Sequence, residues 1–234
     1  VFSVVGRCAE RLGIATQELM VWLTGQARTV TLYSALPGHL AKIAAAMPPG
    51  HPWQDVEHLI HNHTALGYFS FFHPPEKRAA FANLLAHQDA SHPITLALGL
   101  TAYRTPAVPK SPRFCLDCTR EQAEQLGFAY FRLEHQLPGV SVCWKHGHPL
   151  YHGCVHCGPY PLPRKRLTMP RQCLCSSFEP LAIEAEETSP EKIWLAANSA
   201  LILAQVDDQK TNRFSLLRSG IMAAGFRRKS NLHY

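Results

Sequence analysis

Apolar residues recur at three- and four-residue spacing through much of the first hundred positions, as they do in helices that bury one face. This spacing predicts two short helices over residues 3–24, separated by Gly13 and ended by Gly25. Residues 38–105 show the same helical spacing, with breaks at Pro48-Pro49-Gly50 and further on at prolines. The N-terminal part of the chain is therefore expected to be all-helical.

The helix–glycine–helix pattern at residues 3–24 has two interpretations. It matches the outline of a DNA-binding helix-turn-helix, and it matches any helical hairpin. The second helix carries Gln17 and Glu18 but no Arg or Lys, whereas base-reading helices commonly use such cations. The hairpin interpretation is favoured. The residues expected to face the core are Val5, Cys8 or Ala9, Leu12, Leu19, Trp22 and Leu23.

Helical spacing returns near the C-terminus. Thr188 and Glu191 form a capping box around Pro190, which is typical of a first helical turn. The pattern predicts a helix over 193–206 and a last helix over 213–224. The side chains available to the core from the first of these are Trp194, Leu195, Leu201 and Leu203.

Between these helical parts lie closely spaced cysteines. Seven of the eight cysteines fall between positions 115 and 175, whereas Cys8 stands alone and is expected to be a buried thiol. The pairs are Cys115 with Cys118, Cys143 with His146, Cys154 with Cys157, and Cys173 with Cys175. These eight donors fill two tetrahedral zinc sites, and a two-residue gap lets one tight turn direct both donors at one ion.

Two other interpretations of these cysteines, a disulfide framework and a redox motif, have weaker support. A disulfide framework needs an oxidising compartment, and a redox Cys-x-x-Cys occurs as one pair rather than several in a row. Sequential pairing places Cys115, Cys118, Cys143 and His146 on one ion and the last four cysteines on the other; interleaved pairing is the alternative. Four further histidines could replace a ligand: His135, His148, His152 and His156.

The expected zinc sites are structural rather than catalytic. A catalytic zinc keeps an open coordination position, whereas four protein ligands close the site. The sequence has no His-Glu-x-x-His motif, phosphate-binding glycine loop or Gly-x-Ser-x-Gly elbow. We therefore expect no enzymatic activity. The less favoured alternative is a zinc-dependent enzyme, in which three protein ligands hold one ion that also binds water.

The predicted fold is mainly α-helical with small zinc-knuckle or ribbon regions. Three regions are expected: a helical domain over 1–110 with a candidate helix-turn-helix, a double zinc-binding region over 111–180, and a helical segment over 181–234. No apolar run reaches 18 residues, which excludes a membrane-spanning helix. The first residues lack the layout of a signal peptide, so a cytoplasmic protein associated with the nucleoid is expected.

Charge permits an anionic partner without requiring one. The formal net charge is +6, and seven zinc-bound thiolates with two zinc ions would reduce it to about +3. The sequence has two runs of three consecutive cations, at 164–166 and 227–229. Such a run usually lies on a solvated face, but cations on a loop that is held in place by zinc also suit DNA phosphates. The candidate DNA contacts are Arg164, Lys165, Arg166 and Arg171, with Arg227, Arg228 and Lys229.

Three segments together resemble the TniQ family. They are Cys115-Leu-Asp-Cys118, the run His135-Gln-Leu-Pro-Gly139, and Cys143-Trp-Lys-His146-Gly-His-Pro-Leu150. Segments 36–40, 59–64 and 214–225 extend the resemblance over most of the chain. The resemblance implies the same two zinc sites as sequential pairing.

The resemblance also implies a role in choosing where a transposon inserts. TnsD-like members of the family bind a specific attachment sequence in double-stranded DNA and recruit the AAA+ regulator TnsC. Other members dock on a CRISPR effector complex and lack their own sequence specificity. Two hypotheses follow. The chain is a DNA-binding selector that recruits TnsC, or it is a protein–protein adaptor that can form a homodimer and has little DNA affinity alone.

Overall fold

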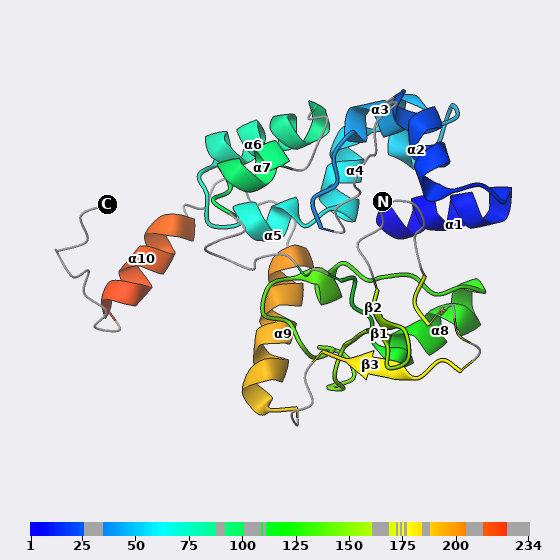
Figure 1. Ribbon diagram of the computed structural model, residues 1–234. Coiled ribbons are helices and arrows are strands. Elements are labelled where there is room, and N and C mark those ends of the chain that lie inside the picture. Colours follow the sequence, from blue (N-terminus) through cyan, green and yellow to red (C-terminus); the bar gives the residue numbers. More distant parts are fainter. Residues whose placement is uncertain are drawn as a thin grey trace.

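The computed structural model describes residues 1–25, 35–87, 92–100, 109, 111–160, 169–171, 173, 175, 177–183, 188–204 and 213–223. In this part of the chain the fold is mainly helical, with one three-stranded sheet. Figure 1 shows the helices from the first hundred residues above the cysteine-rich part, with α9 beside both and α10 at the edge. No helix among the described residues is long and apolar enough to cross a bilayer.

The upper layer consists of short helices joined by tight turns. Its elements are α1 (Phe2–Leu12), α2 (Thr16–Thr24), α3 (Leu40–Ala45), η1 (Pro52–Gln54), α4 (Val56–His63), α5 (Leu66–Ser70), α6 (Pro75–His87) and α7 (His92–Ala97). Gly13 and Gly25 end α1 and α2 with φ of 67° and 68°, a left-handed conformation that glycine adopts without strain. Asp55 caps α4, since its carboxylate accepts hydrogen bonds from the backbone N–H groups of Glu57 (2.8 Å) and His58 (3.2 Å).

The core of the upper layer continues into the cysteine-rich part. Leu36, Leu40, Leu59 and Leu85 are essentially inaccessible to solvent, and the same buried cluster contains Phe114. The cluster also includes Phe131 and Tyr160. Residues 112–114, which lead into the first cysteine pair, are therefore buried in the structure.

Three expectations for the N-terminal hairpin were wrong. Trp22 and Leu12 are 63% and 58% exposed, and Cys8 is exposed as well. The core side of the hairpin consists of Val5, Ala9, Leu19 and Met20. Helix α2 has apolar residues around much of its circumference, so spacing alone does not reveal which of its faces is covered.

The cysteine-rich part contains one helix, one short 3₁₀ turn and a small sheet. They are α8 (Leu116–Leu126), η2 (Glu134–Gln136), β1 (Tyr151–Cys154), β2 (Gly158–Pro159) and β3 (Pro180–Ala182). The sheet is antiparallel in the order β2-β1-β3. Gly153 is required in β1, because a Cβ atom there would lie 2.3 Å from the backbone oxygen of Gly158.

Two C-terminal helices are described, α9 (Pro190–Ala204) and α10 (Arg213–Ala223). Helix α9 packs against both α5 and η2, so it connects the upper layer with the cysteine-rich part. Pro190 is its first residue, as expected, but the cap is Ser189 rather than Thr188: the backbone N–H of Lys192 bonds to the Ser189 hydroxyl at 3.4 Å.

The buried face of α9 differs from the expected one. Its fully buried residues are small, namely Ala196, Ser199 and Ala200, whereas Trp194 and Leu201 are 67% and 61% exposed. Small residues let the helix approach its neighbours closely. Apolar spacing overestimated the contribution of the large side chains because both faces of this helix are apolar.

Candidate metal centres

The structure brings the eight predicted donors together as two groups of four. We call Cys115, Cys118, Cys143 and His146 the first cluster, and Cys154, Cys157, Cys173 and Cys175 the second cluster. In each, the donor atoms all lie within 4.8 Å of one another. These are the groups that sequential pairing predicts, and each could hold one metal ion.

The first cluster is formed by the start of α8 and a tight turn. Cys115 is the N-cap residue of α8 and Cys118 lies in its first turn. Cys143 and His146 lie in a turn closed by the backbone bond from Gly147 N–H to the Cys143 carbonyl at 2.8 Å. The helix begins directly after Cys115, so the first cysteine pair lies at its N-cap and in its first turn.

Distances in the first cluster fit a tetrahedral ion. The Sγ atoms of Cys118 and Cys143 are 3.7 Å apart, and His146 Nδ1 lies 3.5 Å from the Sγ of each cysteine. Metal–sulfur bonds of about 2.3 Å place tetrahedral sulfurs about 3.8 Å apart. All three cysteines are buried and the histidine is partly exposed.

Charge in the first cluster also favours a cation. Hydrogen bonds from the Cys115 and Cys118 thiols lower the pKa of Cys143 far below its usual range. Bonds to Cys115 and Cys143 in turn raise the pKa of Cys118 strongly. Neighbouring thiols therefore ionise one at a time, whereas a bound dication stabilises several thiolates together.

The second cluster lies at the ends of the small sheet and is more open. Cys154 ends β1 and is buried, Cys157 lies exposed in the turn before β2, and Cys173 and Cys175 are half-buried. Its Sγ–Sγ distances are 3.7 Å from Cys154 to Cys175, 3.0 Å from Cys157 to Cys173, and 2.9 Å from Cys173 to Cys175. One distance matches a tetrahedral edge and two are shorter.

Thiol acidity differs within the second cluster too. Although burial opposes ionisation of Cys154, backbone hydrogen bonds lower its pKa to about 6. Hydrogen bonding to Cys175 and Cys157 raises the pKa of Cys173 to about 12. The donor set of four cysteines suits zinc, and a dication there would again stabilise the thiolates that are hardest to form.

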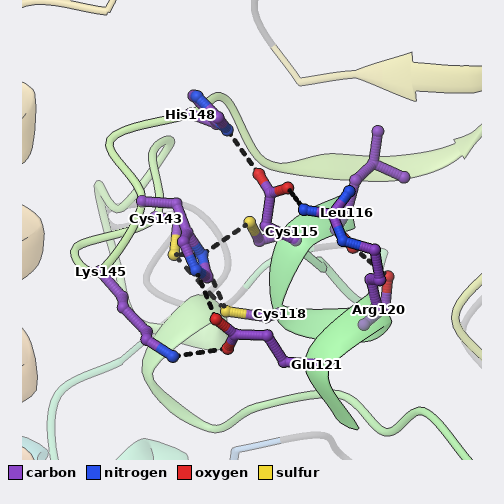
Figure 2. Close-up of polar contacts among 11 residues, drawn as sticks. Cys115, Leu116, Cys118, Arg120, Glu121, Cys143, Lys145 and His148 are labelled. Atoms are coloured by element: carbon purple, nitrogen blue, oxygen red, sulfur yellow. Dashed lines mark hydrogen bonds and ion pairs between the residues drawn. The ribbon is translucent and has the colours of Figure 1, made fainter. Parts of the chain in front are cut away.

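Charged side chains surround the first cluster (Figure 2). The Glu121 carboxylate accepts from His146 Nε2 at 3.1 Å and from Lys145 Nζ at 2.5 Å. Asp117 accepts from His148 Nδ1 at 2.5 Å and also pairs with Arg120. Both acids lie on α8, so two ion-pair bridges join the helix to the turn that carries His146.

The run His135-Gln-Leu-Pro-Gly139, which had no assigned role beyond the resemblance, braces the first cluster. The Gln136 side chain accepts from Arg113 N–H (2.9 Å) and donates to the Arg113 carbonyl (2.7 Å). The buried Arg113 guanidinium donates to the carbonyls of Leu137 (3.0 Å) and Val140. Gly139, at φ 71°, lies against α9, since a Cβ atom there would be 3.3 Å from the Leu195 side chain.

The remaining predicted site residues do not join either cluster within the described part of the chain. His148 bonds to Asp117, and His156 lies 3.3 Å from Glu179. His135 is buried beside Cys143, where it further favours the thiolate and lowers the pKa of that thiol. His152 is partly buried.

Of the candidate DNA contacts, one is described. Arg171 is exposed, two residues before Cys173, with a left-handed backbone φ of 64°. The others lie outside the described residues: Arg164, Lys165, Arg166, Arg227, Arg228 and Lys229.

The geometry thus defines the class of protein: a mainly helical protein with two candidate metal centres. The TniQ family model matches residues 1–150, and the chain belongs to the TniQ family. The match contains the whole first cluster and ends before Cys154.

Similarity to a curated relative agrees with this assignment. The chain is 28% identical over 147 residues to the transposon Tn7 transposition protein TnsD of Escherichia coli. That alignment covers 63% of this chain and 28% of TnsD, so the chain matches less than a third of the relative's length.

Proposed function

We propose that this chain acts in DNA transposition as a target-site selector. In this role it binds attachment-site DNA and recruits the AAA+ regulator TnsC. The observation that carries the proposal is the TniQ family match over 1–150, and the similarity to a Tn7 transposition protein supports it. The role is non-catalytic, because four protein donors in each cluster would leave no open coordination position for a reaction.

Two structural Zn²⁺ ions are part of the proposal. The first cluster supplies three sulfurs and one imidazole nitrogen, and the second supplies four sulfurs; both are common donor sets of structural zinc. Bound zinc would cross-link the segments that carry the donors. The exposed Arg171, two residues before Cys173, would then be held in one orientation toward a DNA phosphate.

The alternative function is an adaptor that links a CRISPR effector complex to TnsC without sequence specificity of its own. One observation favours it: two cations beside the first cluster are already paired, Arg120 with Asp117 and Lys145 with Glu121. Paired cations contribute less to binding DNA phosphates. Exposed Trp22 and Trp194 provide apolar area for contact with a protein.

Fluorescence anisotropy tests the two functions. The zinc-loaded protein is titrated with an attachment-site duplex and a scrambled duplex at two salt concentrations. A selector prefers the attachment site by at least about 100-fold, and the affinity falls with salt. Equal, weak and salt-labile binding of both duplexes would reject the selector function for this chain. Copurification with TnsC and the effector complex, together with the mass of the particle in solution, then tests the adaptor and a homodimer.

A further inference from the structure

His146 directs one ring nitrogen toward the three cysteines of the first cluster and the other toward helix α8. Nδ1 lies 3.5 Å from the sulfurs of Cys115, Cys118 and Cys143. Nε2 lies 3.1 Å from Glu121 Oε1. A neutral imidazole carries a single N–H, so Nδ1 can donate its lone pair to a metal only when the proton is on Nε2. An acceptor at Nε2 favours that tautomer.

Glu121 is itself held in place from two directions. It follows Cys118 by three residues on α8, so both side chains lie on the same face of the helix. Its second oxygen, Oε2, accepts from Lys145 Nζ at 2.5 Å, and Lys145 is the residue before His146. The carboxylate therefore connects the helix that carries one ligand to the turn that carries two others (Figure 2).

We propose that Glu121 is the positioning residue of the first metal centre. It accepts the Nε2 proton of His146, orients the ring with Nδ1 toward the ion, and increases the electron density that Nδ1 offers. Partners of this kind around ligating histidines change metal affinity by about 10–100-fold. The inference rests on the first cluster holding a metal, but not on whether the chain reads DNA.

The chain contains a matched control for this role. Asp117 lies four residues before Glu121 on α8, and its carboxylate bonds to His148 at 2.5 Å. His148 belongs to the same metal-binding turn as His146. His148 is not part of either cluster. Replacing Asp117 removes a comparable bridge between α8 and the turn, but it leaves the imidazole of the cluster untouched.

The test uses the full chain with Glu121→Ala, Glu121→Gln and Asp117→Ala. Zinc affinity is measured by competition with a chromophoric chelator, and ¹¹³Cd NMR distinguishes the site with three sulfurs and one nitrogen from the site with four sulfurs. We expect Glu121→Ala to weaken the first site by about 10–100-fold. Glu121→Gln, whose amide oxygen still accepts a hydrogen bond, should recover most of this loss. Asp117→Ala should change the affinity by less than about threefold.

A second readout concerns the tautomer. In ¹⁵N-labelled protein the Nε2 proton of His146 should exchange with solvent faster in Glu121→Ala than in wild type or Asp117→Ala. Equal loss of affinity in Glu121→Ala and Asp117→Ala would overturn the positioning role, because any bridge would then suffice. Wild-type protein with no metal at the first cluster would overturn the metal assignment and the positioning role together, and the ¹¹³Cd spectrum of the wild type separates that outcome from the first.

Discussion

The first and second clusters have similar donors but different surroundings. The first is built on a regular helix, its three thiols are buried, and acidic side chains contact the imidazole and the turn that carries it. The second lies at the ends of short strands, with Cys157 exposed. Burial and outer partners determine how accessible a bound ion is, so we expect the first site to bind tightly and the second to exchange more readily.

Replacing a cysteine should therefore have the largest and most unequal effects. Cys143→Ser should reduce zinc content from two ions to one and lower the melting temperature most, because structural zinc contributes about 10–16 kcal/mol in small domains. Cys157→Ser should also remove one ion but lower the melting temperature less. Zinc analysis and thermal denaturation measure both. Similar melting temperatures for the two variants would contradict the difference between the clusters, and Cys8→Ser is the control that should change neither.

The support beneath the first cluster should come next in size. Arg113→Met leaves the carbonyls of Leu137 and Val140 without their guanidinium donor, and each buried unsatisfied group costs about 1–3 kcal/mol. Urea denaturation of zinc-loaded protein measures the loss. Arg120→Met removes only an exposed ion pair, so its cost should stay within about 0.5 kcal/mol.

Two glycines separate backbone strain from packing on α9. Gly139 and Gly127 have similar φ values, 71° and 76°, but only Gly139 has a neighbour within 4 Å of an added Cβ, the Leu195 side chain at 3.3 Å. Either substitution by Ala should cost about 1–2 kcal/mol through the left-handed conformation. Gly139→Ala should cost more than Gly127→Ala in the same urea experiment. Equal costs would mean that the Leu195 side chain moves aside freely and that α9 does not restrain the backbone at Gly139.

The smallest effect should come from the ion pair between Glu134 and Arg132, measured as the difference between wild type and Glu134→Gln in acid. Burial raises the pKa of Glu134, but the adjacent Arg132 guanidinium lowers it below the ordinary value of 4.5. A lowered folded-state pKa contributes stability that is present above pH 4.5 and is lost as pH falls through the folded-state pKa. Between pH 6 and pH 3 the urea midpoint should fall more steeply in wild type than in Glu134→Gln. Parallel curves would exclude this ion pair from the support of the 134–140 segment.

Several features were readable from local patterns. Glycines with positive φ end α1 and α2 where expected, and Pro190 begins α9, because these residues act through their own backbone geometry. The two groups of four donors were predictable too, since short spacing within each pair brings donors together. Tertiary packing, in contrast, overrode the expected faces of α2 and α9, where Trp22, Trp194 and Leu201 are exposed.

The sequence by itself determined the family, the mainly helical character and the eight clustered donors, since these follow from residue type and spacing over short distances. Only the tertiary structure decided which ring nitrogen of His146 faces the sulfurs, that Glu121 holds the other, and that Arg113 and Gln136 brace the turn behind them. Arg113 and Gln136 are 23 positions apart, and Glu121 and His146 are 25 apart. Contacts at such separations depend on how α8, η2 and the metal-binding turn pack, and no local pattern specifies that packing.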